Sequence, residues 1–462
     1  MKIFLLCSRR PIVAEFVLLA DSLWKSGFTP SLIVPEGLLP SLPKELPPEW
    51  QILTTGAKSW RTAGLFAFFI YIAFALTRRI SAILKYRRTT FASDFIDTWE
   101  GIARGKEFAK NVLRIERSSC AAILTADDRD IRFDQGMIAE GRRQNIFTLT
   151  VAFGKSDANA DFFRRNSPPY QINSSPCRSI KRKIADTYPN GIKKHAETGP
   201  LLFFRPGEYW ALRLHDSLFP VPWSYGGGTS DKVAVIDRQA EKMLLASGVA
   251  KTKVMLAGQC SHDALWLLRT QRKAIRQMLN VEHGFKPSDK LLILALPVFG
   301  EHGMVDRTAH IAETEWLFST LKALEGCAVL VSLHPRQSRK DYDPISLRLN
   351  IKIAKEPLRD VLAAADLFVA NSSTINWAQL LQIPSVALEY YELGYELFSD
   401  EPGVFTVRSR DTLQSACQAI LNESEIFNAL CNSLERLGDD VPFDGQARQR
   451  IITDIKRHSR KN

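Results

Sequence analysis

Short apolar runs alternate with amphipathic segments along the 462 residues of this chain. Apolar runs rich in β-branched residues predict buried strands, and apolar residues spaced three or four apart predict helices. In the first half we predict strands at 3–7, 28–34, 121–125, 147–151, 232–236 and 254–257, and helices at 12–25, 134–143, 237–247 and 262–279. Strands separated by helix-length segments favour parallel sheets with right-handed crossovers.

The alternation resumes after a polar linker at 282–290. Here we predict strands at 291–297, 329–333, 351–354, 367–370 and 384–388, and helices at 313–324, 357–365, 375 onward, 410–422 and 423–437. A chain of this length is too long for one hydrophobic core. We therefore expect an α/β protein with domains at 1–281 and 282–440 and a basic tail helix at 441–462. Residues 155–200 are polar and basic without clear periodicity, which predicts a long loop or insertion.

Composition narrows the class of protein. Hydrophobic residues make up 45% and charged residues 24% of the chain, as in folded soluble proteins. The seven cysteines are scattered and form no C-x-x-C pair, which argues against a disulfide framework or zinc site and fits a reducing cytoplasm. The net charge of +11 points to an anionic partner. Basic nucleic-acid motifs rich in aromatic residues are absent, so a membrane surface or an anionic substrate is favoured over nucleic acid.

Segment 61–88 is the candidate membrane-binding element. Its sixteen uncharged residues at 62–77 are followed by a basic flank that includes Arg78, Arg79, Arg87 and Arg88. A bilayer span needs roughly 20 apolar residues. A shorter apolar helix beside basic residues favours docking in the plane of an anionic leaflet. We therefore expect a cytoplasmic protein peripheral to the inner face of the membrane, with a buried core helix as the alternative.

Two polar loops follow predicted strands of the second half. One contains His334 and Arg336, and the other contains Ser372, Ser373 and Thr374 immediately before a helix. Ligands of open α/β sheets bind at the carboxyl ends of the strands. Hydroxyl groups and backbone N–H groups at a helix start attract an anion, and an imidazole with a guanidinium completes a phosphate cradle. An ordinary N-cap serine and a structural loop histidine are the alternative interpretation.

Further candidates lie at other predicted strand ends of the second half. Gly300, Glu301, His302 and Gly303 follow its first strand, where glycines permit close approach of the backbone to a phosphate. Glu389 follows its last strand and could bind a hydroxyl of a ribose or sugar. Plain turns are the alternative for both places.

Asp127 and Asp128 follow the strand at 121–125 in the first half. A carboxylate at a strand end could act as a general base that removes a proton from a hydroxyl. Successive residues of a strand alternate between faces, so only one of the pair is expected to face the ligand. A helix N-cap or a salt bridge with Arg129 is the alternative.

Two stretches of the chain resemble those of a known superfamily. Residues 231–265 (DKVAVIDRQAEKMLLASGVAKTKVMLAGQCSHDAL) are similar to the end of the first domain of GT-B glycosyltransferases and the related non-hydrolysing UDP-GlcNAc 2-epimerases. Residues 360–388 (DVLAAADLFVANSSTINWAQLLQIPSVAL) are similar to the segment with which these proteins hold a nucleotide diphosphate. The His-Pro pair and downstream serines also resemble the phosphate-contacting motifs of bacterial sialyl- and Kdo-type transferases. The E-x7-E motif of retaining GT-B enzymes is absent.

The resemblance implies a GT-B fold, in which two Rossmann-like domains with parallel sheets face a central cleft. It also implies an inverting, metal-independent glycosyltransferase that needs no cofactor. Such an enzyme would move a sugar from a nucleotide-sugar donor to a bacterial surface-polysaccharide or lipid-linked acceptor. Asp127 or Asp128 would then deprotonate the acceptor, and His334 would assist at the departing phosphate. A nucleotide-sugar 2-epimerase or hydrolase, and a non-catalytic nucleotide-sugar-binding assembly protein, are the alternatives.

Overall fold

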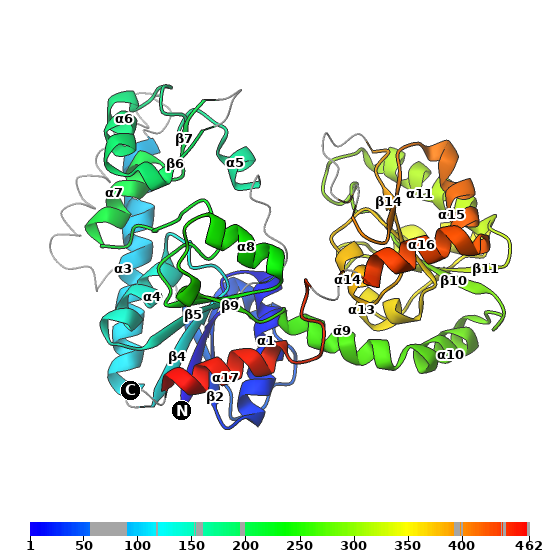
Figure 1. Ribbon diagram of the computed structural model, residues 1–462, viewed down its shortest axis with the longest axis horizontal. Coiled ribbons are helices and arrows are strands. Elements are labelled where there is room, and N and C mark those ends of the chain that lie inside the picture. The colour runs from blue at the N-terminus through cyan, green and yellow to red at the C-terminus, as the bar shows by residue number, and fades with distance from the viewer. Residues whose placement is uncertain are drawn as a thin grey trace. The chain divides into compact units, whose positions relative to one another are not determined.

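The computed structural model describes residues 1–55, 90–116, 119–151, 153, 160–194, 199–391, 398, 401–435, 437 and 440–459. The chain forms two compact units, unit 1 (Met1–Cys260 with Gln446–Asn462) and unit 2 (Ser261–Gly445), each with its own parallel sheet (Figure 1). The candidate membrane-binding segment 61–88, including Arg78, Arg79, Arg87 and Arg88, lies outside the described residues. Among the helices that the structure does describe, none is both long and apolar enough to cross a bilayer.

Unit 1 is built on a seven-stranded sheet in which every neighbouring pair is parallel. In spatial order its strands are β3 (Gln51–Thr55), β2 (Thr29–Pro35), β1 (Lys2–Leu6), β4 (Cys120–Thr125), β5 (Phe147–Val151), β8 (Lys232–Val235) and β9 (Val254–Leu256). Central β1 is buried on both faces. Its register places Leu5 beside Leu32 of β2 and Leu124 of β4. Strands β1, β2 and β4 are nearly continuously buried, as expected for a sheet that is covered on both sides.

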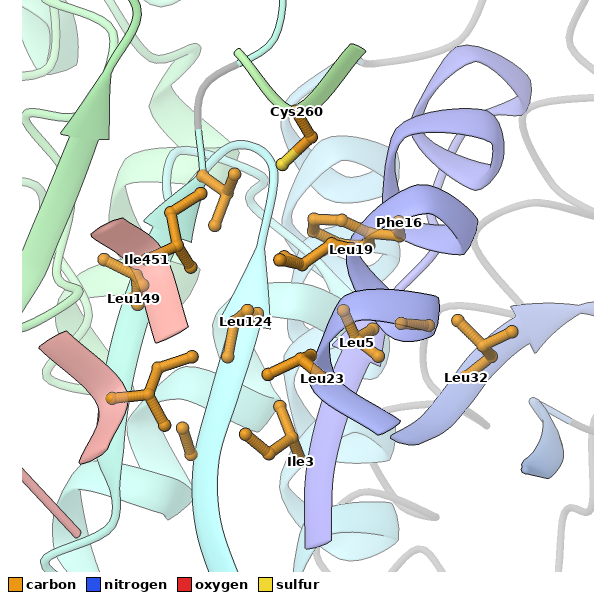
Figure 2. Close-up of a cluster of buried hydrophobic side chains, with 14 of the residues drawn as sticks. Ile3, Leu5, Phe16, Leu19, Leu23, Leu32, Leu124, Leu149, Cys260 and Ile451 are labelled. Atoms are coloured by element: carbon orange, nitrogen blue, oxygen red, sulfur yellow. The ribbon is translucent and has the colours of Figure 1, made fainter. Parts of the chain in front are cut away.

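Helices cover both faces of this sheet. One face carries α1 (Arg10–Lys25) and α17 (Ala447–Ser459), and the other carries α3 (Thr90–Glu116) and α4 (Phe133–Arg143). Figure 2 shows side chains of α1 and α17 packed over alternate strand residues, and the labelled ones include Phe16, Leu19, Leu23, Ile451, Leu5, Leu124 and Leu149. The C-terminal helix thus completes the core of the first unit.

Helices α3 and α4 cross closely because glycines lie at their contact. A Cβ atom on Gly105 would lie 2.1 Å from the carbonyl oxygen of Phe133, and one on Gly136 would lie 2.2 Å from that of Ile102. Only glycine leaves room for backbones this near to one another. The crossing brings the start of α4 and the middle of α3 together beside the carboxyl ends of β1 and β2.

The residues that connect β5 to β8 in the sequence form a lobe with its own helices and strands. It contains α5 (Ala160–Arg165), α6 (Arg178–Thr187), an antiparallel pair of β6 (Ile192–Lys193) with β7 (Leu201–Leu202), and α7 (Pro206–Leu214). The prediction of a long loop at 155–200 is therefore wrong for α5, α6 and β6. These elements are short and are held by an aromatic cluster that includes Phe203, Phe204 and Phe219. Helix α5 and strand β6 are too short to show a clear hydrophobic period, and α6, which is rich in charged residues, buries only Lys181 and Ile184.

Unit 2 has a six-stranded sheet, again with parallel pairs throughout. Its spatial order is β12 (Lys352–Ile353), β11 (Cys327–Ser332), β10 (Lys290–Ala295), β13 (Leu367–Ala370), β14 (Ser385–Leu388) and β15 (Val404–Val407). One face is covered by α11 (Arg307–Lys322), α12 (Arg339–Leu349), α15 (Leu413–Asn422) and α16 (Ser424–Glu435). The other is covered by α9 (Cys260–Thr270), α10 (Arg272–His283), α13 (Leu358–Val361) and α14 (Ile375–Leu380). Helix α8 (Arg238–Ala246) belongs to unit 1.

The predicted α/β class with two parallel sheets is confirmed, but the units are bounded differently from the predicted domains. The division falls between Cys260 and Ser261, where we expected it after residue 281. Ile275 and Leu279 of α10 are buried in the core of unit 2, so this helix joins the second unit. The predicted separate tail at 441–462 is instead largely part of unit 1, because α17 buries its isoleucines there.

Candidate functional site

The polar loops predicted on unit 2 all lie at one edge of its sheet. Strands β11, β10, β13 and β14 are neighbours and run parallel, so the loops that follow them emerge at the same edge. We call this edge the loop edge of unit 2. It carries every residue that the sequence assigned to donor binding, namely Gly300, Glu301, His302, Gly303, His334, Arg336, Ser372, Ser373, Thr374 and Glu389.

His334 is exposed at the loop edge, and its ring orientation is fixed by a local hydrogen bond. The backbone N–H of Arg336 donates to Nδ1 of His334 at 3.1 Å. Partial burial lowers the pKa of His334, and the charges of Arg336 and His302 lower it further. A neutral ring that accepts at Nδ1 carries its proton on Nε2. His334 can therefore donate an Nε2–H hydrogen bond at neutral pH.

Gln337 connects this histidine to the loop that follows β10. Its side-chain Oε1 accepts from the backbone N–H of His334 at 2.8 Å, and its Nε2 donates to the carbonyl oxygen of Pro297 at 2.9 Å. The ring of His302, on the same β10 loop, lies 6.4 Å from the ring of His334. Gln337 is buried, so the two histidine-bearing loops are held together from beneath.

Glu301 braces the β10 loop from within the unit. Its carboxylate accepts a hydrogen bond from Tyr342 and one from Arg307 Nη1 at 2.5 Å. Burial would raise the pKa of Glu301, but these hydrogen bonds outweigh it and lower the pKa. A Cβ atom on Gly300 would lie 2.8 Å from the ring of His310, so glycine permits the close packing of this loop. In this arrangement Glu301 supports the loop, whereas His302 and Gly303 are exposed.

The loop after β13 exposes hydroxyl groups at the start of α14. The hydroxyls of Ser372 and Thr374 share a hydrogen bond of 2.6 Å, and Ser373 is exposed. The side-chain amide of Asn371 donates to the carbonyl oxygen of Leu388, which ties this loop to the end of β14. The N-cap residue of α14 is Thr374, which makes no side-chain cap hydrogen bond, so the alternative of an ordinary N-cap serine is not what the structure shows.

Aromatic residues link the ends of β10 and β14. Tyr391 packs edge-on against Phe299 at 4.6 Å between ring centroids, and Tyr390 lies 4.5 Å from Tyr391. Glu389 is partly buried beside them, and its backbone N–H donates to the carbonyl oxygen of Val407. These contacts join the ends of β10 and β14 through packed aromatic rings at the loop edge.

Asp128 of unit 1 is a buried structural group in this structure. Its side chain has 0% exposure, and its Oδ2 accepts from Ser230 Oγ at 2.7 Å and lies 3.3 Å from Lys253 Nζ. A carboxylate with no exposed surface cannot meet an acceptor hydroxyl in this conformation. The structure therefore gives no support to the predicted catalytic role of Asp128.

Asp127 forms a salt bridge with Arg129, which was the alternative to a catalytic role for this residue. Its Oδ1 accepts from the backbone N–H of Arg129 at 3.0 Å and from Arg129 Nε at 3.2 Å. Arg129 also pairs with Asp161 of α5 through a contact of 2.7 Å. Asp127 and Arg129 thus fasten the inserted lobe to the end of β4.

A pocket that the sequence did not reveal lies at the carboxyl ends of β1, β2 and β3. Its volume is about 500 Å³, and its polar lining includes Ser8, Arg104, Glu107, Asp130, Arg132 and Asp134. Thr125 Oγ1 donates to Asp134 Oδ2 at 3.0 Å. Burial, and then the charge of Asp130, raises the pKa of Asp134 well above its ordinary value. The acidic residues after β4, Asp127, Asp128, Asp130 and Asp134, were a signal in the sequence, but only Asp127 and Asp128 were predicted as site residues.

No protein-family model and no curated protein matches this chain. Solved structures do. The UDP-GlcNAc 2-epimerase from Neisseria meningitidis bound to UDP-GlcNAc has a TM-score of 0.53 at 12% identity, with 100% of both chains covered. The UDP-GlcNAc 2-epimerase from Methanocaldococcus jannaschii has 0.51 at 15% identity, covering 99% of this chain and 100% of that one. The glycotransferase of kitacinnamycin has 0.51 at 10% identity, covering 99% and 98%.

This chain has the GT-B fold. The likeness extends over essentially the whole length of all three structures. At these identities it establishes the fold alone, and it confirms the predicted two-domain architecture. The fold does not fix the reaction, which depends on the side chains at the loop edge of unit 2 and in the pocket of unit 1.

Proposed function

We propose that this protein is a glycosyltransferase that uses a nucleotide-sugar donor, inverts the configuration of the transferred sugar and needs no metal ion. The observation that carries the proposal is the convergence of His302, His334, Arg336 and Ser373 at the loop edge of unit 2. All four are exposed, and they come from three neighbouring strand ends. This is the place at which open α/β sheets bind nucleotides.

These groups suit the leaving group of sugar transfer. As the bond between the sugar and the phosphate of the nucleotide breaks, negative charge grows on the phosphate oxygen. The guanidinium of Arg336 supplies positive charge, and the Nε2–H of His334 supplies a directed hydrogen bond. Ser373 adds a hydroxyl at the start of α14. Donors that are fixed before the reaction stabilise this charge without reorganisation, as Gln337 fixes His334 here.

For the acceptor we propose a bacterial surface polysaccharide or a lipid-linked glycan, used by an enzyme peripheral to the membrane. Two properties of the sequence support this choice. The net charge is +11, and the apolar segment 62–77 is followed by a dense basic flank. Both properties favour binding of the enzyme to an anionic membrane surface, where such an acceptor would be located.

The second candidate function is that of a nucleotide-sugar 2-epimerase, because two of the structures with a similar fold are UDP-GlcNAc 2-epimerases. The reactions separate when UDP-, GDP-, dTDP-, ADP- and CMP-sugars are incubated with and without a membrane-lipid or polysaccharide extract. A transferase attaches labelled sugar to the extract and releases free nucleotide only slowly in its absence. Rapid conversion of a nucleotide sugar to its C2 epimer without extract would establish the rival. Nucleotide-sugar binding without turnover under either condition would indicate a non-catalytic binding protein.

A further inference from the structure

A second pocket of unit 1 lies beside its C-terminal helix. Helix α17 packs over β4 and β5, and the pocket is lined by α17 together with β8 and β9, the next two strands of the sheet. Its volume is about 350 Å³, at the low end of the range of small-molecule sites. All of its lining segments belong to unit 1. We call it the α17 pocket, and its lining includes Lys232, Met255, Arg450, Thr453, Asp454 and Arg457.

The periodicity of α17 directs several polar side chains to this pocket. Arg450, Thr453 and Arg457 are spaced by three and four residues, so they share one face of the helix. Lys232, at the start of β8, lines the pocket as well. Two arginines and one lysine therefore surround one space, and Asp454 is the one acidic residue among the described residues of its lining.

Two of the three cationic groups are held in place by contacts within unit 1. The ammonium group of Lys232 donates to Oδ1 of Asp454 at 2.9 Å, and the side chain of Asp454 is only 6% exposed. Nη1 of Arg450 donates to the carbonyl oxygen of Ala257, just after β9, at 3.1 Å. Groups that are fixed before a ligand arrives lose less conformational entropy when it binds.

Positive charge exceeds negative charge in the α17 pocket. Oδ1 of Asp454 lies 2.9 Å from Nζ of Lys232 and 3.9 Å from Nη1 of Arg457, so one carboxylate oxygen is shared by two cations. Nδ1 of His458 lies 3.6 Å from the other oxygen, Oδ2, and adds charge only when the ring is protonated. This excess favours an anionic ligand. A phosphate group has several oxygens that can accept hydrogen bonds from guanidinium and ammonium groups at once.

The rest of the lining suits carbon and hydroxyl groups. Met255 and Leu256 of β9 supply apolar surface, and Gln449 and Thr453 of α17 supply an amide and a hydroxyl group. Nε2 of Gln449 donates to Oγ1 of Thr453 at 3.4 Å. These residues offer packing for a short carbon chain, and hydrogen-bond donors and acceptors for its hydroxyl groups.

We propose that the α17 pocket binds a small phosphate ester that carries hydroxyl groups, with Lys232, Arg450 and Arg457 holding its phosphate. The site belongs to unit 1, whereas the loop edge belongs to unit 2, so it goes beyond the proposed function and does not depend on it. Soluble sugar or polyol phosphates and the phosphate headgroups of lipids share this chemistry. A bound ester would connect α17 to β8 and β9 and thereby stabilise unit 1.

Binding is tested by calorimetric titration of the full chain with glycerol 3-phosphate and glucose 6-phosphate, and with glycerol and glucose as their uncharged counterparts. At least one of the esters should bind saturably, and its uncharged counterpart should not bind. Arg450→Gln and Arg457→Gln should each weaken this binding by roughly tenfold, because each removes hydrogen bonds to a charged phosphate. Lys456→Gln is the matched control, since it removes the same charge from α17 at a residue that lies over the Phe28 ring and does not line the pocket. This control should bind the ester as the wild type does.

His334→Ala separates the α17 pocket from the loop edge of unit 2, where the proposed function also places a phosphate. The ester should bind to His334→Ala as it binds to the wild type. Loss of ester binding in His334→Ala but not in the two arginine variants would assign the ester to the loop edge and overturn the inference, and the proposed function would stand. Failure of the wild type to bind any nucleotide sugar would count against the proposed function alone.

Flotation with phosphatidylcholine vesicles that contain phosphatidic acid identifies the source of the phosphate. Weaker flotation of Arg457→Gln than of Lys456→Gln would assign the pocket to a lipid headgroup. Equal flotation together with saturable ester binding would assign it to a soluble ester. Equal flotation without binding of either ester, or equal weakening of ester binding by Arg457→Gln and Lys456→Gln, would overturn the inference.

Discussion

At the residue scale, Asp127 and Asp128 have different environments although they are neighbours in the sequence. Asp127 keeps 18% of its side chain exposed and pairs with the buried Arg129, whereas Asp128 is fully buried and pairs with Lys253 and Ser230. The sequence predicted that only one of the two side chains faces the ligand, because successive strand residues alternate between faces. It could not identify Lys253 and Ser230 as partners, because both lie more than a hundred residues away.

We predict that Asp128→Ala lowers the free energy of unfolding by about 3 kcal/mol, because it leaves the buried end of Lys253 without its charge partner. Urea denaturation followed by circular dichroism measures this change. Asp186→Ala, at an exposed position of α6, serves as the control and should change the free energy by well under 1 kcal/mol. An Asp128→Ala variant of normal stability that loses transfer activity would return Asp128 to the catalytic role.

Glu301 should make unfolding sensitive to acid. Its pKa lies below the ordinary value of 4.5 because hydrogen bonds from Tyr342 and Arg307 outweigh the effect of burial. A lowered pKa stabilises the folded protein above the ordinary value, and this contribution is lost as the pH falls through the folded pKa. We therefore expect wild type to lose more stability than Glu301→Gln between pH 5 and pH 3, in urea titrations at both pH values. Parallel losses in the two proteins would contradict the assigned role of Glu301.

At the scale of elements, the sequence predicted the buried strands best. The strands expected at 147–151 and 367–370 have those bounds in β5 and β13. Strand β3 was missed because only alternate residues turn inward and its run is partly polar. Helix α3 was missed because Gly101 and Gly105 interrupt a weakly apolar pattern, and glycine has low helix propensity. Glycine is needed at these two positions because Arg132 and the start of α4 pack against them, and the local sequence does not reveal this contact.

The close crossing of α3 and α4 gives a direct prediction. Gly136→Ala places a methyl group against the backbone of Ile102, so it should lower the free energy of unfolding by about 1–3 kcal/mol. Thermal and urea unfolding of the purified variant measure the change. Gly37→Ala is the control, since a Cβ atom there meets nothing within 4 Å. Equal stability of the two variants would show that the helices can separate at little cost.

At the scale of the whole molecule, the candidate site of unit 2 could be predicted and the pocket of unit 1 could not. His334 and Ser373 follow their strands closely, and Gly303 lies on the loop after β10, so parallel topology brings them to one edge. The pocket depends on α3 and on the contact of Gly105 with Gly136, which only the tertiary structure provides. The return of α17 to unit 1 was missed for the same reason, because its isoleucines indicate burial but not the partner.

Charge distribution over the chain leads to a prediction about membranes. Each basic residue near an anionic surface contributes about 1 kcal/mol, and salt weakens the attraction. Wild type should therefore float with anionic liposomes at low salt, and replacing Arg78, Arg79, Arg87 and Arg88 with Gln should release it. The variant should keep its activity on a soluble acceptor. A wild type that stays in the aqueous fraction with anionic vesicles at low salt would rule out membrane docking.

The central claim is that the loop edge of unit 2 binds the phosphate group of a nucleotide sugar, and calorimetric titration tests it most directly. One nucleotide sugar of the UDP, GDP, dTDP, ADP and CMP series should bind to the wild type. Its affinity should fall by roughly 10- to 100-fold in His334→Ala and in the Ser372/Ser373 double alanine variant, because each loses hydrogen bonds to a charged phosphate. His283→Ala, on α10, should bind normally. Unchanged donor affinity in both loop-edge variants would contradict the account.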